Sequence, residues 1–124
     1  MKMTESLENY LETILILSQK KTQVRSIDVA EELNFKKPSV SVAMKNLREH
    51  DYVTFSPEGF ITLTAKGREV ADAIYERHQL FSSLLQDLGV PAEIALHDAC
   101  RIEHVISPES FQAIKTCLPK HKGL

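Results

Sequence analysis

The chain has 124 residues, of which 43% are apolar and 26% are charged. These proportions are those of a globular protein, which excludes a disordered chain, and the length allows one domain or one compact module with a helical annex. The formal net charge of −2 by itself disfavours a polyanionic partner such as nucleic acid. Because no run approaches the roughly 20 apolar residues of a membrane helix and the N-terminus lacks a signal-peptide pattern, we expect a cytoplasmic protein with no membrane partner.

Two helices are predicted in the first 35 residues. Apolar residues recur at helical spacing over residues 7–15, after a cap at Thr4 or Ser6, which predicts an amphipathic helix of about four turns. A second, short helix is predicted to begin at Ser26. It ends near Asn34, a residue type that adopts the left-handed conformation of a helix C-cap.

A third helix and a β-hairpin follow. Residues 37–39 open the helix with a proline at an early position, where its missing N–H costs nothing. Residues 52–55 and 60–64 are predicted to form two strands joined by a turn at 56–59. The buried face of the third helix is expected to consist of Val40, Ala43, Met44 and Leu47.

The second half of the chain is predicted to be entirely helical. Thr64 caps a long helix over residues 65–88, and a further helix covers residues 91–106. Ser107 caps a last helix that extends to Leu118, and residues 119–124 are expected to form a frayed tail. The fold class is therefore mainly α.

The order of the first elements is typical of a winged helix-turn-helix, in which the later helix of the pair enters the major groove of DNA. The segment from Lys36 to Arg48 contains four cations and no acidic residue, so it carries +4 within a chain of −2. A near-neutral total does not forbid such a patch, and double-stranded DNA becomes a candidate partner.

Lysines and hydroxyls surround the start of this third helix, whose free N–H groups and dipole favour phosphate oxygens. We expect Pro38, Ser39 and Val42 to face base edges. The phosphate contacts are expected from Lys37, Ser41, Lys45 and Arg48. The alternative is a solvated charged helix with ordinary capping. The predicted DNA-binding set is Lys36, Lys37, Pro38, Ser39, Ser41, Val42, Lys45 and Arg48.

A thiol, a carboxylate and an imidazole recur at helical spacing near residue 100. Cys100, Glu103 and His104 stand at i, i+3 and i+4 and so share one face of a helix. This donor set suits a borderline divalent metal such as Fe(II), Co(II), Ni(II) or Zn(II). One helix cannot complete such a site. Further candidate ligands are Asn9 and Glu12 on the first helix and His78 on the long helix.

Each of these residues also has a purely structural interpretation. Glu12 and Glu103 are then surface charges, His78 is a satisfied polar side chain, and Cys100 is a small core residue. Cys100 and Cys117 can in principle pair, although cytosolic chains of this size keep thiols reduced or use them as ligands. The metal interpretation is favoured because three donors fall together on a helix otherwise patterned for burial.

The segment over residues 99–107, ACRIEHVIS, together with Arg77-His78, resembles the metal-binding core of the iron-dependent (diphtheria toxin) repressor family, which includes the manganese transport regulators. The likeness is co-linear over nearly the whole chain. It includes residues 8–12, 37–41 and 63–67.

This resemblance implies a homodimer with a winged helix-turn-helix DNA-binding domain over residues 1–70 and a helical metal-binding and dimerisation domain over residues 71–124. It implies the short, two-domain form of the family, a metal-dependent repressor that acts on a palindromic operator of metal homeostasis genes. By position, His78, Cys100, Glu103 and His104 match family ligands and Glu12 matches a carboxylate ligand of the manganese branch, while Asn9 stands where members have methionine or aspartate.

Ligand softness makes Fe(II) the first choice of metal and Mn(II) the second, with Co(II), Ni(II) or Zn(II) able to bind in vitro. Since the ligands come from both domains, a bound ion is expected to clamp them and fix the separation of the recognition helices.

Two other functions remain open from the sequence. A small metalloenzyme needs an open coordination position and a general base, and the chain has neither a Gly-rich phosphate loop nor a nucleophile with an evident base, so we expect no enzyme. The other alternative is a winged-helix regulator that responds to a different ligand, or a protein-interaction module, with the Cys/Glu/His set serving the fold.

Overall fold

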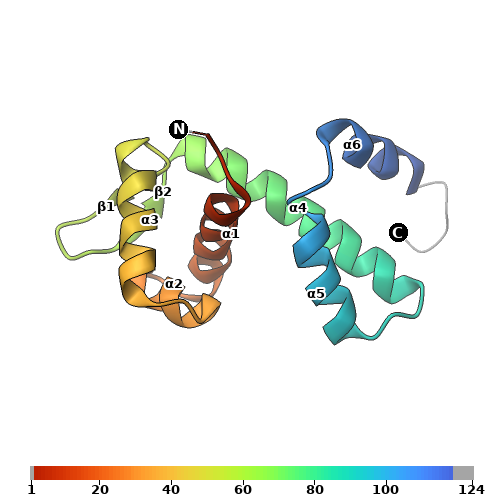
Figure 1. Cartoon of the computed structure of the whole chain (residues 1–124), viewed down its shortest axis with the longest axis horizontal. Helices are drawn as coiled ribbons and strands as arrows, with labels where there is room; N and C mark the ends of the chain where they lie inside the picture. Colours follow the sequence, from red (N-terminus) through yellow and green to blue (C-terminus); the bar gives the residue numbers. More distant parts are fainter. Residues whose placement is uncertain (1, 119–124) are drawn as a thin grey trace. The chain divides into compact units, whose positions relative to one another are not determined.

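The computed structural model describes residues 2–118 and divides into two compact units, Met1–Asp72 and Ala73–Leu124. The fold is mainly helical with one small sheet, as predicted (Figure 1). The expected tail over residues 119–124 lies outside the described residues. The elements are α1 (Glu5–Lys20), α2 (Ser26–Leu33), α3 (Lys37–Glu49), β1 (Val53–Phe55), β2 (Ile61–Leu63), α4 (Ala65–Asp87), α5 (Ala92–Ile102) and α6 (Pro108–Cys117).

The ends of α1 and α2 follow local chemistry. Of the two caps predicted for α1, Thr4 is the one used: its Oγ1 accepts the N–H of Leu7 at 3.2 Å. At the end of α2, Asn34 has φ of 57° and ψ of 42°, the left-handed C-cap that the sequence predicts. Leu11 and Ile14 of α1 are fully buried, so the apolar stripe of the helix faces the core of the N-terminal unit.

The hairpin pairs β1 with β2 in antiparallel register, with Val53 opposite Leu63 and Phe55 opposite Ile61. Each strand is shorter than predicted, because the ladder contains only three residues on each side. In Figure 1 the hairpin lies beside α3 within the N-terminal unit. The predicted buried face of α3 is confirmed, since Val40, Ala43, Met44 and Leu47 are all buried.

The close approach of the Tyr52 backbone to the start of α4 explains why residue 67 is a glycine. Thr64 caps the helix, as predicted, by accepting the N–H of Gly67 at 3.1 Å. A Cβ atom at Gly67 would lie 2.0 Å from the carbonyl oxygen of Tyr52. The backbone that leads into β1 therefore packs directly on α4, at a distance that only glycine permits.

The C-terminal unit is built around a small aromatic core. Phe81 of α4 and Phe111 of α6 are buried, with ring centroids 6.1 Å apart, and Ala99 of α5 is fully buried beside them. Aliphatic side chains complete the cluster: Leu80, Ile102, Ile106 and Ile114. Ile94 and Leu96 of α5, in contrast, are 53% and 45% exposed.

The prediction of a helix that continues to Ile106 is wrong, because α5 ends at Ile102 and residues 103–106 form a turn. Ser107 then caps α6 by accepting the N–H of Ser110 at 3.0 Å. Pro108, which has no N–H to donate to a preceding helix and disfavours the helical conformation at Ser107, prevents α5 from continuing into α6. Over residues 2–118 no helix combines the length and the apolar character needed to cross a bilayer.

Candidate metal centre and nucleic-acid interface

The three donors near residue 100 lie together at the C-terminal end of α5. Cys100 occupies the last turn of the helix, Glu103 is its C-cap and His104 follows in the turn. One ligand atom from each of these residues lies within 4.8 Å of the other two. The spacing of i, i+3 and i+4 therefore unites the donors although the helix stops at Ile102, because Glu103 keeps helical backbone angles (φ −59°, ψ −26°).

The carboxylate of Glu103 is fully buried between two imidazoles. Its Oε2 lies 2.9 Å from Nδ1 of His78, and its Oε1 lies 3.3 Å from Nε2 of His104, whose side chain is 2% exposed. A buried carboxylate needs a compensating positive charge, which protonated imidazoles or a cation can supply. Thiolate, carboxylate and imidazole within this small volume are a donor set that fits a borderline divalent metal.

Arg77 also contacts this region, although the sequence did not predict a role for it in the site. Its Nη1 donates to the carbonyl oxygens of Glu103 at 3.2 Å and Ile106 at 2.8 Å. Its Cζ lies 5.3 Å from the centroid of the Phe111 ring. No local sequence pattern indicates these two bonds, because they join residues 26 and 29 positions apart.

The other two predicted ligands, Asn9 and Glu12, belong to the N-terminal unit. Asn9 is half-buried and Glu12 is 4% exposed, about one turn apart on α1 of the N-terminal unit. The group of His78, Cys100, Glu103 and His104 belongs to the C-terminal unit, so the participation of the two α1 residues remains a prediction. His97 is 73% exposed and is not part of the ligand group.

The predicted nucleic-acid surface lies on the outward face of α3. Pro38 stands in the first turn of the helix, no acidic residue occurs there, and Val42 is 63% exposed. The free N–H groups at the start of α3 favour anions, and the first turn of the helix carries no acidic side chain that would repel them. All eight residues of the predicted set are exposed: Lys36, Lys37, Pro38, Ser39, Ser41, Val42, Lys45 and Arg48.

A notch of about 210 Å³ beside α3 extends the predicted nucleic-acid surface. It is lined in part by Ser26 and Phe55, which the sequence did not predict to belong to this surface. Its polar lining consists of Ser26 from the start of α2 together with Ser41, Lys45 and Arg48 from α3. Phe55 of β1 also lines it, and the Arg48 Cζ lies 5.6 Å from the Phe55 ring centroid. Two hydroxyls and two cations around one depression suit a phosphate group.

Asp28 stabilises the start of α2, the helix that contributes Ser26 to the notch. Its Oδ1 accepts from Nζ of Lys21 at 2.7 Å, and its Oδ2 accepts the backbone N–H of Arg25 at 2.8 Å. The hydrogen bond from Lys21, followed by that from Arg25, lowers the pKa of Asp28 below its ordinary value of 3.8. The Arg25 Cζ in turn lies 4.5 Å from the ring centroid of Phe60, beside β2.

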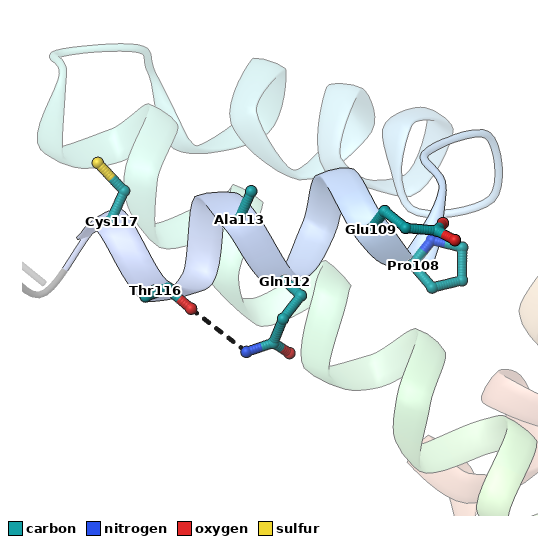
Figure 2. Close-up of a pocket in the computed structure, with 6 residues that line it drawn as sticks. All are labelled: Pro108, Glu109, Gln112, Ala113, Thr116 and Cys117. Carbon is teal, nitrogen blue, oxygen red and sulfur yellow. Dashed lines mark hydrogen bonds between the residues drawn. The ribbon is translucent and has the colours of Figure 1, made fainter.

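A surface depression on α6 has few side chains that could bind a metal or a charged ligand (Figure 2). Its two ionisable side chains, Glu109 and Cys117, stand at opposite ends of the helix in Figure 2. Nε2 of Gln112 donates a hydrogen bond to Oγ1 of Thr116 at 3.3 Å. The depression therefore brings together no donor set of the kind found at the end of α5.

A winged helix with a basic outward face, followed by a helical unit with a Cys/Glu/His donor group, defines the class of metal-responsive DNA-binding regulators. The chain belongs to the iron-dependent repressor family: residues 2–60 match its N-terminal DNA-binding domain, and residues 64–122 match its metal-binding and dimerisation domain. This is a family of transcriptional regulators, not of enzymes.

Two curated relatives cover most of the chain. A helix-turn-helix transcriptional regulator of Methanocaldococcus jannaschii is 34% identical over 97% of this chain and 98% of its own length. The transcriptional regulator MntR of Escherichia coli O157:H7 is 33% identical over 94% of this chain and 76% of its own length. Both alignments extend across the DNA-binding and the metal-binding regions.

Among solved structures, a manganese-dependent transcriptional repressor in complex with manganese superposes with a TM-score of 0.83 at 26% identity. The match covers 91% of this chain and 52% of that chain. The present chain thus spans about half the length of that structure.

Proposed function

We propose that this protein is a metal-dependent transcriptional repressor of metal homeostasis genes that binds a palindromic operator as a homodimer in the cytoplasm. The observation that carries this proposal is the donor group of Cys100, Glu103 and His104. The same chain also contains α3, a helix with an exposed basic face. The family membership supports both halves of the proposal.

The metal ligands in this proposal are His78, Cys100, Glu103 and His104, joined by Asn9 and Glu12 from α1. A bound divalent cation would supply positive charge and coordination bonds that hold its donors at fixed positions. Glu103 is buried between two imidazoles and is the donor most dependent on such a charge. Ligands from α1 would make the position of the DNA-binding unit depend on the metal, which is the basis of a switch.

Fe(II) is our first choice for this metal and Mn(II) our second. The thiolate of Cys100 is a soft ligand, and thiolates and imidazoles bind Fe(II) more strongly than Mn(II), which prefers oxygen donors. Manganese is the metal named for the related repressor structure. The two metals therefore have to be compared directly.

The homodimer is supported by apolar side chains that the C-terminal unit leaves exposed. Leu88 and Val105 are 72% and 74% exposed, and Ile94 and Leu96 are about half exposed. Exposed apolar side chains of this size are available for association with a second copy of the unit. A dimer with twofold symmetry would present two α3 helices to two half-sites of a palindrome.

The experiment is an anaerobic fluorescence-anisotropy titration of the protein against a labelled palindromic duplex, with Fe(II), Mn(II), Co(II) or Zn(II) and with chelator. We expect tight binding only with metal, reversed by chelator, with Fe(II) effective at the lowest free concentration. Binding of equal affinity in chelator would contradict metal dependence. Metal uptake without any gain in DNA affinity would contradict the switch, while Mn(II) acting at lower concentration would reverse the order of metals.

A further inference from the structure

We propose that Arg77 is a positioning residue for the metal ligands, an inference that rests on the metal site proposed above. Arg77 touches no donor atom of the ligand group in the described contacts. Its role is to hold the turn that carries Glu103 and His104, so that the donors keep their spacing before a metal binds.

The turn needs such a support because it follows the last residue of α5 and lies outside any helix or strand. Its backbone carbonyl groups therefore need donors from side chains or solvent. Arg77 donates to two of the carbonyl oxygens in this region, those of Glu103 at 3.2 Å and Ile106 at 2.8 Å. One guanidinium thus ties both ends of the 103–106 turn to α4.

The guanidinium is itself held in place. Its Cζ lies 5.3 Å from the centroid of the Phe111 ring, and Phe111 is a buried member of the core cluster. A planar guanidinium carries five donors in a fixed fork and packs on aromatic rings. A half-buried arginine with two carbonyl partners and an aromatic neighbour therefore has little rotational freedom.

Arg77 and His78 act on the same residue from adjacent positions of α4. His78 contacts the Glu103 carboxylate through Nδ1 at 2.9 Å, while Arg77 binds the Glu103 backbone carbonyl. Glu103 is thus held by both its side chain and its main chain. Because ligand atoms must be placed accurately for metal affinity, residues that fix the backbone of a ligand contribute to that affinity without touching the metal.

The test compares Arg77→Gln and Arg77→Lys with the wild type and with a control, Lys115→Ala. Lys115 pairs with Glu76 at 2.6 Å, which joins α6 to α4 in the same unit without contact to the turn. Three quantities are measured. Co(II) affinity is obtained from the visible and thiolate charge-transfer absorption, and the helical circular dichroism and the thermal midpoint are obtained for the metal-free protein.

We expect Arg77→Gln to lower Co(II) affinity by about 10- to 100-fold, the range for residues that orient metal ligands. Arg77→Lys, which keeps a charged donor but loses the planar group that packs against Phe111, should fall between Gln and wild type. Lys115→Ala should bind Co(II) as the wild type does. Metal-free helicity should be unchanged in all three variants.

Wild-type Co(II) affinity in both Arg77 variants would overturn the positioning role and leave the proposed metal site intact. Loss of helicity in both metal-free Arg77 variants would also overturn it, because Arg77 would then serve the fold. If the wild type itself bound no Co(II), the proposed metal site and this inference would fail together.

Discussion

The outward face of α3 and the turn after α5 use charged groups in opposite ways. On α3 the cations are exposed and are separated from the core by a fully buried stripe that includes Val40 and Leu47. In the turn after α5, the Glu103 carboxylate is fully buried and lies against the imidazoles of His78 and His104. Exposed cations suit a large polyanion that approaches from solvent, whereas a buried carboxylate responds to a small cation that can enter.

This difference determines how each region should respond to substitution. A buried charged group depends on few partners, so its loss or theirs has a large effect. An exposed cation is one of several that share a polyanion, so its removal has a small effect that depends on salt.

Replacing the buried carboxylate should abolish the response to metal. We expect Glu103→Ala to lower affinity for Fe(II) or Mn(II) by at least about 100-fold, above the range for residues that only orient ligands. Isothermal titration measures this affinity. The matched control is Glu93→Ala, which removes an exposed carboxylate from the first turn of the same helix. A Glu103→Ala protein that bound metal as tightly as Glu93→Ala would show that the buried carboxylate is not a ligand.

A second variant acts on the scaffold of the N-terminal unit alone. Gly-to-Ala changes in helices ordinarily stabilise by about 0.5–1 kcal/mol, but Gly67→Ala places a Cβ 2.0 Å from the Tyr52 carbonyl oxygen. We expect a destabilisation of about 2 kcal/mol, typical of overpacking, together with weaker DNA binding. Urea unfolding measures the first effect. Glu69→Ala, at an exposed site on α4, is the control, and a stabilised Gly67→Ala protein would contradict the tight packing.

Removing one cation from α3 should alter DNA binding and leave metal affinity unchanged. Lys45→Ala should weaken binding to all sequences alike and reduce the slope of log affinity against log salt by about one. Anisotropy titrations from low to moderate salt measure this slope. Lys20, exposed in the last turn of α1, supplies the control variant Lys20→Ala. An unchanged slope in Lys45→Ala would remove this residue from the interface.

The smallest effect concerns the start of α2. Asp28 has a lowered pKa in the folded protein, so its charged form stabilises the fold above pH 3.8, and this contribution is lost as the pH falls through the lowered value. We expect Asp28→Asn to be less stable by about 1 kcal/mol at pH 7, the usual contribution of such a cap. Urea unfolding from pH 7 to pH 2.5 should show the two proteins converge. A difference independent of pH would contradict the role of the carboxylate.

Local signals account for what could be predicted from the sequence. The helices α1 to α3 are set by apolar spacing, a threonine cap, an asparagine C-cap and an early proline, all of which act within a few residues. The grouping of Cys100, Glu103 and His104 also depends only on spacing along one turn. Such features are encoded by short-range geometry and can be predicted without knowledge of the packing.

Contacts between residues distant in sequence account for the rest. The Arg77 bonds to the turn after α5 span 26 and 29 residues, and no periodicity reports them. The notch beside α3 depends likewise on Ser26 and Phe55, which come from separate elements. The predicted end of α5 differs for another reason, because apolar residues at helical spacing continue to Ile106 although the helix ends at Ile102.

The central claim is that metal binding and DNA binding are coupled, and coupling of this kind is reciprocal. The most direct test measures Fe(II) or Mn(II) affinity anaerobically, with and without a palindromic duplex selected by the metal-loaded protein. The account predicts that the duplex raises metal affinity by the same factor by which the metal raises DNA affinity, about 5- to 150-fold for typical couplings. Equal metal affinities with and without the duplex would contradict it.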